Sequence, residues 1–455
     1  MKNCIRIPAA LLLFILSPLL HAQDQFKLPY EQFELPNGLK VVLYKDTSLP
    51  VVAVNMVYRA GSALDEKGKS GLANIVGAMM LQGSKHISSK RFLNVMDECG
   101  ASFGGMVDVD KINFWSIFPA RYLETALWIE SDRLGFSAQT FTAVQLDSIR
   151  KKIIRESERT EKTIPVMAKQ LLYAALYPPA HPYSWLTSGK IHEVAKLKLK
   201  DVQSFTSKYI VPANASLCIG GNFDFARAKE LVKKYFADIP KQKTPGINGD
   251  LQVIPPPKSQ NISIEKSMDN SRLYLVFQTV PAGAHDESVL HLIARILSGD
   301  RFARLTKTLI LTQKIAVDIQ SYQSSQQFGG TFWIVVACRP EVNLMAVYNG
   351  VMKELDNLAT EPIEESELTS IKNKLRNSML SPLEHLGGFS GRVDALNMAN
   401  LFTGNPGSAL NLLHSIDLIT PVAIKTAASQ YLKPERCITL SVVQLGKSNL
   451  ALPTN

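Results

Sequence analysis

Histidine pairs would carry the most recognisable metal chemistry, because two imidazoles on one helical face are a frequent start of a catalytic zinc site. The chain has eight histidines, and no two of them are three or four residues apart: His21, His86, His181, His192, His285, His291, His385 and His414. That spacing would place two ligands on one face of a helix. The closest pair, His285 and His291, crosses an expected loop-to-helix boundary. No local histidine pair for zinc is present, and a site assembled from distant residues stays open as an alternative.

Serine and cysteine chemistry has no clear motif either. A serine hydrolase would show a Gly-x-Ser-x-Gly turn, whereas residues 387–391 read Gly-Gly-Phe-Ser-Gly and are interpreted as a flexible turn between helices. Ser-Gly-Asp at 298–300 is too short to cradle a phosphate. The cysteines beyond residue 22 form no Cys-x-x-Cys pair. We expect them to be buried free thiols, with disulfides as the alternative: Cys99, Cys218, Cys338 and Cys437.

The composition favours an exported protein of two domains. The chain has 455 residues, of which 46% are hydrophobic and 20% charged, which is enough for two full cores. Its net charge of +10 comes from lysines interspersed with acidic residues, so nucleic-acid binding is not expected. Residues 1–22 combine Lys2 and Arg6 with an apolar run ending in Leu-His-Ala, which predicts a cleaved signal peptide and a periplasmic protein. An uncleaved anchor is the alternative, and no membrane segment is expected in the mature chain.

The first half of the chain alternates strand and helix patterns. Apolar runs on both sides of Asn37 and Gly38 predict a hairpin. The nearly all-apolar segment 71–82 predicts a buried helix. Strands are also expected over 51–58 and 215–220, a hairpin within 103–118, and helices over 120–134, 143–161 and 225–236.

A proline-rich segment at 241–260 is the expected linker to a second half that restarts the pattern. Lys-Tyr-Ile-Val-Pro at 208–212 recurs as Gln-Tyr-Leu-Lys-Pro at 430–434, each time between a helix-like segment and an apolar strand. This match indicates an internal duplication. We therefore expect an α+β protein with two homologous domains, 23–240 and 261–455, each a mostly antiparallel sheet packed with helices.

A series of short motifs resembles the pitrilysin/insulinase family of zinc peptidases, especially its exported bacterial and processing-peptidase-like members. In the first half the motifs include Leu-Pro-Asn-Gly-Leu at 35–39, Tyr-Arg-Ala-Gly-Ser at 58–62, Gly-Leu-Ala at 71–73, Gln-Gly-Ser at 82–84, Glu-Ser-Asp-Arg at 130–133 and His-Pro-Tyr at 181–183. Residues 298–305 and 392–397 add to them in the second half. The resemblance covers nearly the whole mature chain and implies one half of a clamp that encloses a peptide.

The resemblance also implies a zinc motif, His-x-x-Glu-His, on the helix at 71–82. Its two histidines would bind zinc, and its glutamate would activate the metal-bound water as general base. In this chain the three positions are Asn74, Gly77 and Ala78. Asparagine is a poor zinc ligand, and glycine and alanine have no group that can act as a base or bind a metal. These positions are degenerate.

The family's third zinc ligand, a glutamate on a later helix, aligns with Glu156. Glu156 shares helical spacing with Leu146, Ile149 and Ile153, which predicts that it lies on the apolar face of its helix. It is interpreted either as a relict ligand or as a glutamate at the edge of the core that a basic side chain or water satisfies. One ligand cannot hold zinc in a specific site, so no cofactor is expected.

Two further family features are degenerate as well. The Asn-Ala pair that holds the substrate backbone, on the strand after the zinc helix, corresponds to Gly104 and Gly105. An arginine and a tyrosine seven residues apart, which contact the substrate or the oxyanion in the family, correspond to Ile310 and Val317. Both of those positions are apolar here.

These substitutions favour a non-catalytic subunit of an exported zinc peptidase. In that reading a catalytically intact paralogue supplies the zinc, and the heterodimer encloses unfolded peptides. A stand-alone peptide-binding scaffold, such as a homodimer, is the alternative. An active zinc metalloendopeptidase is a less favoured third reading, because it would need a metal site that the motifs do not contain.

Overall fold

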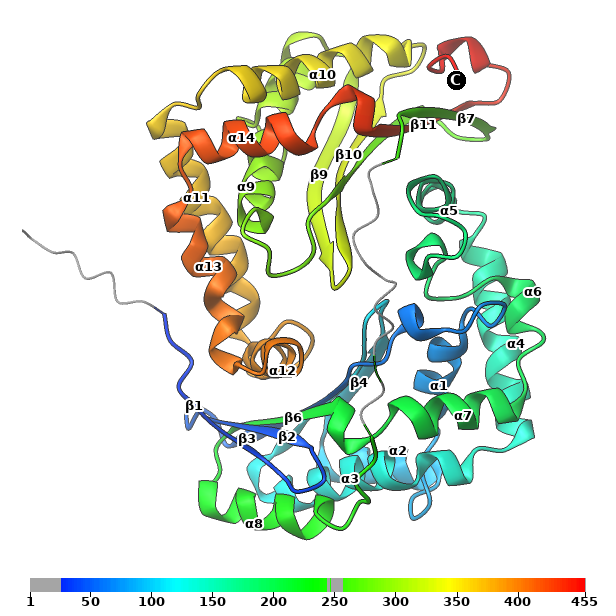
Figure 1. Cartoon of the computed structure of the whole chain (residues 1–455), viewed down its shortest axis with the longest axis vertical. Helices are drawn as coiled ribbons and strands as arrows, with labels where there is room; N and C mark the ends of the chain where they lie inside the picture. Colours follow the sequence, from blue (N-terminus) through cyan, green and yellow to red (C-terminus); the bar gives the residue numbers. More distant parts are fainter. Residues whose placement is uncertain (1–25, 244–245, 247–256, 455) are drawn as a thin grey trace, which may run out of the picture.

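The computed structural model describes residues 26–243, 246 and 257–454. The chain folds into two β-sheets, each packed with helices, and the two halves lie opposite each other (Figure 1). This is the α+β architecture that the sequence predicts. The expected signal peptide at 1–22 and most of the expected linker at 241–260 fall outside the described residues.

The first sheet has the strand order β1-β2-β6-β3-β5-β4, and only the β2–β6 pair is parallel. The hairpin at Asn37 and Gly38 joins β1 to β2 as predicted. Gly38 has a φ of 91°, which glycine adopts without strain, and Asn37 Nδ2 donates to the carbonyl oxygens of Phe236 and Ile239. The strands are β1 (Tyr30–Glu34), β2 (Lys40–Lys45), β3 (Val51–Tyr58), β4 (Ser102–Val107), β5 (Ile112–Pro119) and β6 (Ala215–Gly221).

The helices of this half share one hydrophobic core with a face of the first sheet. The expected helices at 71–82, 120–134, 143–161 and 225–236 correspond to α1, α3, α4 and α8. The bounds are α1 (Leu72–Met80), α2 (Ser89–Cys99), α3 (Leu123–Thr140), α4 (Ala143–Thr160), α5 (Ile164–Leu176), α6 (Ile191–Val194), α7 (Leu199–Tyr209) and α8 (Phe225–Phe236).

The second sheet has the order β7-β11-β8-β10-β9, and only the β7–β11 pair is parallel. Its strands are β7 (Gln260–Lys266), β8 (Arg272–Thr279), β9 (Ala316–Gln326), β10 (Gly329–Cys338) and β11 (Cys437–Gln444). The helices are α9 (Glu287–Leu297), α10 (Leu344–Thr360), α11 (Glu365–Leu380), α12 (Arg392–Thr403), α13 (Asn411–Ser415) and α14 (Pro421–Tyr431).

The two sheets repeat one topology, which confirms the expected duplication. From β2 and β7 onward the strand orders match, and the parallel pair holds the same place in both. The recurring motifs at 208–212 and 430–434 also match in structure. Each closes a helix, passes through a short 3₁₀ turn (Pro212–Asn214 or Pro434–Arg436) and enters the strand of the parallel pair that lies inside the sheet.

The two halves interlock, because each covers the other's sheet with one helix. Helix α12 from the second half packs on β2, β3 and β6, whereas α5 from the first half packs on β8 and β11 (Figure 1). The approach of α12 is close: a Cβ at Gly220 on β6 would stand 2.2 Å from Cγ2 of Val393. Each half therefore contributes one helix to the core of the other.

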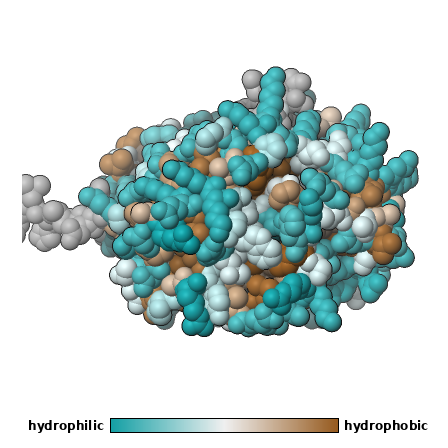
Figure 2. Space-filling view, turned by 90° about the horizontal axis from the view of Figure 1, so that it is seen from below, coloured by the Kyte–Doolittle hydropathy of each residue, from teal (hydrophilic) through white to brown (hydrophobic). Residues whose placement is uncertain are grey.

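The outer face that carries α3 and α8 is mostly hydrophilic, with hydrophobic residues in small separated patches (Figure 2). Within the described part of the chain, no single helix has the length and apolar character to cross a membrane. The segments Pro406–Leu418 and Pro421–Tyr431 pass that test only as a pair, and they meet at an angle of 107°.

Candidate functional site

The three positions of the zinc motif lie on α1, which packs against α4, α7 and the edge strand β4. Asn74 and Ala78 are one helical turn apart, and both are half-buried, so they share a face of α1 as their spacing predicts. Gly77 is buried on the side of β4. Asn74 and Ala78 are therefore spaced as two zinc ligands on one helical face would be. Their side chains are an amide and a methyl group, whereas zinc binding would need two imidazoles.

Gly77 is held against β4 so closely that no side chain fits there. A Cβ at this position would stand 2.3 Å from Cγ2 of Val107, well inside van der Waals contact. Valine has a stiff χ1 angle, so Val107 does not turn away cheaply. The position at which the resemblance expects the catalytic base thus carries no side chain, and Val107 occupies the adjacent space.

Helix α1 remains firmly positioned through the buried side chain of Asp65. The two carboxylate oxygens of Asp65 accept hydrogen bonds from the backbone amides of Gly71 (2.7 Å) and Ala73 (2.8 Å), which the first turn of a helix otherwise leaves unpaired. Burial raises the pKa of Asp65 to about 8, while these backbone hydrogen bonds act in the opposite direction. Sequence reasoning missed Asp65, because it lies six residues before the N-cap residue Gly71, and a capping side chain is normally sought at the N-cap itself.

The expectation for Glu156 is wrong: its side chain is exposed on α4. The buried residues of α4 are Leu146, Ile149, Ile153 and Ser157. In a straight helix, eleven residues make just over three turns, so the position that repeats Leu146 is Ser157. Glu156 lies beside this buried face of α4, where its side chain is exposed to solvent. Among the described residues, no group of three histidine, cysteine, aspartate or glutamate side chains is arranged to hold a metal ion.

The substrate-strand positions Gly104 and Gly105 lie on β4, at the free edge of the first sheet. Aromatic side chains of β5 occupy the space on both faces of this strand. A Cβ at Gly104 would stand 2.6 Å from the indole nitrogen of Trp115, and a Cβ at Gly105 would stand 2.6 Å from the ring of Phe114. Phe389 of the second half packs against Trp115 with its ring nearly perpendicular to the indole, the ring centres 5.9 Å apart.

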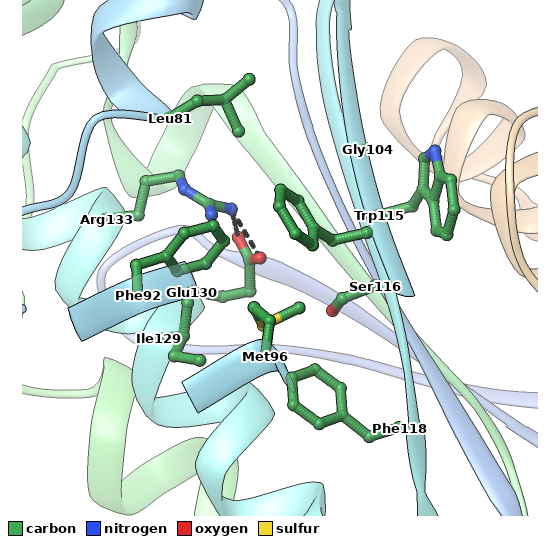
Figure 3. A pocket seen from close by; sticks show the side chains of 11 residues that line it. Leu81, Phe92, Met96, Gly104, Trp115, Ser116, Phe118, Ile129, Glu130 and Arg133 are labelled. Atoms are coloured by element: carbon green, nitrogen blue, oxygen red, sulfur yellow. Dashed lines mark hydrogen bonds and ion pairs between the residues drawn. The ribbon is translucent and has the colours of Figure 1, made fainter. Parts of the chain in front are cut away.

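A buried ion pair lies on the opposite side of β5 from Trp115 (Figure 3). Arg133 donates to both carboxylate oxygens of Glu130 at 2.6 Å, and both side chains are less than a tenth exposed. The guanidinium also lies over the ring of Phe114, 4.6 Å from its centre. Glu130 is the first residue of the Glu-Ser-Asp-Arg motif and Arg133 is the last. Their ion pair, together with the contact of Arg133 with Phe114, holds α3 against the sheet.

The positions expected for the arginine and tyrosine are placed on different elements. Ile310 lies in the helical turn Thr306–Thr312 and packs against the core of the second half. Val317 lies at the start of the edge strand β9 and is 45% exposed. Neither lines the cavity between the two halves, and neither carries a group that could bind a substrate carbonyl or an oxyanion.

Sequence reasoning also missed a cavity of about 720 Å³ between the two halves. The first half contributes Arg59 and the turn between β4 and β5, and the second half contributes α12, the segment before α9 and the turn between β9 and β10. No local pattern could reveal it, because its walls come from residues as distant in sequence as Arg59 and Ala423.

Two family descriptions match the sequence. Residues 40–182 match the insulinase family, peptidase family M16, and residues 196–375 match the peptidase M16 inactive domain. Among curated relatives, the zinc protease PqqE of Helicobacter pylori is 24% identical over 84% of this chain and 86% of its own length. The beta subunit of the mitochondrial-processing peptidase of Saccharomyces cerevisiae is 20% identical over 91% of both chains. A second Helicobacter pylori protein, named a non-peptidase homolog, is 20% identical over 46% of this chain and 48% of its own length.

Solved structures show the same fold. The crystal structure of a protease from Helicobacter pylori superposes with a TM-score of 0.84 at 19% identity, covering 92% of this chain and all of that one. A structure described as the peptidase M16 inactive domain from Pseudomonas fluorescens has a TM-score of 0.82 at 20% identity, covering 94% of this chain and all of that one.

Proposed function

This chain belongs to the insulinase family of M16 peptidases, and on that premise we propose that it is a non-catalytic subunit of an exported zinc peptidase. It contributes half of a peptide-binding chamber, while a paralogue with an intact His-x-x-Glu-His motif supplies the zinc and performs the hydrolysis. The expected signal peptide at 1–22 is the basis for placing the complex in the periplasm.

The observation that carries this proposal is the state of α1. The helix keeps its position and its cap by Asp65, but none of its three motif positions can bind zinc or act as a base. Val107 occupies the space that a side chain at Gly77 would need, so the packing of this helix is complete without one. A structural subunit needs a well-packed α1 helix but no zinc ligands or catalytic base on it.

The names of the relatives support a partnered role. The yeast relative is named as a subunit of a peptidase. Two of the relatives come from Helicobacter pylori, one named a zinc protease and the other a non-peptidase homolog. A paired arrangement of an intact chain and a degenerate one is therefore a reasonable model for this protein.

Co-expression tests the proposal. The mature chain is produced with and without a family paralogue from the same genome that contains His-x-x-Glu-His, and cleavage of unfolded peptides is measured. We expect the two chains to co-purify and the paralogue's kcat/KM to rise by at least tenfold in the complex. Replacing the first motif histidine of the paralogue by alanine is the control and should abolish cleavage. Equal activity with and without this chain would rule the proposal out.

The apolar side chains at Ile310 and Val317 favour a second candidate, a stand-alone peptide-binding scaffold. A stable homodimer that binds peptides and retains no peptidase in a pull-down would support it over the first. The third candidate, an active zinc endopeptidase, is tested by elemental analysis of the purified chain together with a cleavage assay. Stoichiometric zinc and cleavage by this chain alone would establish it.

A further inference from the structure

The cavity between the two halves has the size of a ligand-binding site. Its volume of about 720 Å³ lies within the ~300–1,000 Å³ typical of small-molecule and cofactor pockets. Its apolar wall includes Met398 and Phe402 of α12 and Leu412 of α13, and its polar wall includes Ser325, Asn411 and Ser415. A ligand that fills it therefore has both apolar groups and groups that form hydrogen bonds.

Arg59 forms no ion pair in this cavity, and the acidic side chains Asp110 and Glu287 that also line it are bonded to other groups. It directly follows β3, and its backbone is fixed by hydrogen bonds with Asn214 in both directions. Its Nε donates to Gln327 Oε1 at 3.1 Å, and its guanidinium lies over the ring of Phe402, 5.7 Å from the centre. Among the described residues, no carboxylate lies within ion-pair distance of Arg59. The other cation of the cavity, Lys111, is already paired with Asp108 at 3.2 Å.

The position of Arg59 has an energetic cost that an anionic ligand would remove. The residue is half-buried. Burial lowers the pKa of Arg59, and the charge of Asp110 offsets only part of that effect. Asp110 itself accepts hydrogen bonds from Tyr183 Oη and the backbone amide of Gln327. The terminal guanidinium nitrogens thus remain available to receive a carboxylate in the bidentate geometry that arginine favours.

We propose that this cavity binds the carboxyl-terminal end of an apolar peptide, with Arg59 pairing with the free carboxylate. Met398, Phe402 and Leu412 receive the last side chains, and the polar wall receives the peptide backbone. A fatty acid offers the same carboxylate, but its chain would leave the polar wall unpaired. The inference rests on the proposed function, in which this chain forms part of a peptide-binding chamber.

The test compares two peptides with the intact mature chain. A fluorescent hexapeptide ending in Phe-Leu is prepared with a free carboxylate and as the carboxyl-terminal amide, and binding is measured by fluorescence anisotropy. We expect the acid to bind about tenfold more tightly than the amide, the effect of one hydrogen-bonded charge pair. This comparison needs no variant, so it holds even if a substitution impairs folding. Equal affinity of the two peptides would overturn the inference.

Variants then assign the effect to Arg59. Arg59→Gln should bring the acid to the affinity of the amide, whereas Arg121→Gln, at an exposed arginine on the outside of the first half, should leave the preference unchanged. Palmitate that binds with Arg59-dependent affinity, while the peptide acid shows no advantage over its amide, would also overturn the inference. A failure to stimulate the paralogue would sink the proposed function, and the acid preference of the isolated chain would still be measurable.

Discussion

Cγ2 of Val107 lies 2.3 Å from the point where a side chain on Gly77 would begin. This contact joins Gly77, at the position expected for the catalytic base on α1, to the packing of the edge strand β4. It makes Gly77 a packing requirement, because the zinc-motif helix and β4 approach too closely for any other residue.

Gly77→Ala is therefore expected to destabilise the protein by about 1 kcal/mol or more, as overpacking does. At most helical positions a glycine-to-alanine substitution stabilises the protein instead, because alanine in a helix is favoured over glycine by ~0.5–1 kcal/mol. Gly135→Ala on α3 is the matched control: its Cβ would meet Ile239 only at 3.5 Å, so it should stabilise. Urea denaturation measures both. Val107→Ala should rescue Gly77→Ala, and stabilisation by Gly77→Ala alone would contradict the argument.

The contact of α12 with the first sheet depends on the buried amide of Asn397. Its Nδ2 lies within hydrogen-bonding distance of the backbone and side-chain oxygens of Asn55 and the carbonyl of Ser216. Asn397→Ala leaves these buried acceptors without their donor and should cost about 3 kcal/mol. Asn373→Ala, at an exposed amide on α11, should change stability by no more than ~0.5 kcal/mol. Equal effects of the two variants in urea denaturation would show that the exchanged helix contributes little.

Removing one partner of the buried ion pair should be more damaging than removing both. Arg133→Met leaves Glu130 charged and unpaired in the core and should cost about 3–5 kcal/mol. The double variant Glu130→Leu/Arg133→Met should recover most of that loss. Arg91→Met breaks an exposed pair with Glu98 and should cost less than ~1 kcal/mol. Thermal and urea denaturation provide the comparison, and a double variant no more stable than Arg133→Met would refute this view.

Acidification should weaken the fold through His181. Burial lowers the pKa of His181 to about 4, and its Nδ1 accepts a hydrogen bond from the Tyr183 amide at 3.1 Å, so the folded protein holds the ring neutral. The unfolded chain binds a proton near pH 6.5. Between these values the unfolded state binds more protons, so stability falls as pH falls.

From pH 7.5 to pH 5 this histidine should account for a loss of about 2 kcal/mol. His181→Asn keeps an acceptor for the Tyr183 amide and should reduce the loss measured by urea denaturation at the two pH values. His192→Asn, at a 70% exposed side chain, should not reduce it. His291, whose pKa burial also lowers to about 4, should add a loss of the same sign, whereas Asp65, whose pKa burial raises to about 8, should contribute with the opposite sign. An unchanged pH dependence in His181→Asn would exclude this role.

Much of the architecture was predictable because its signals are local. Asn37 and Gly38 form their hairpin because a tight turn needs those residue types. The missing donors at Asn74, Gly77 and Ala78 are a matter of residue identity, and the one-turn spacing of Asn74 and Ala78 follows from helical geometry alone. The duplication was visible in two short segments, since each closes a helix and opens a strand. Glu156 was placed wrongly because helical spacing does not separate a residue at the edge of the apolar face from one just outside it. Both Glu156 and Ser157 fit the spacing of the buried residues of α4, and only Ser157 is buried.

The residue types alone establish which side chains this protein can use, and Asn74, Gly77 and Ala78 do not form the family's His-x-x-Glu-His motif. Three features follow from the folded chain and from no local pattern: Val107 fills the space beside Gly77, α5 and α12 each pack on the sheet of the other half, and Arg59 lines a cavity without forming an ion pair. These facts depend on contacts such as that of Asn55 with Asp394, 339 residues apart. Residue type and helical or strand period act between near neighbours along the chain, whereas packing brings together residues that no local pattern relates.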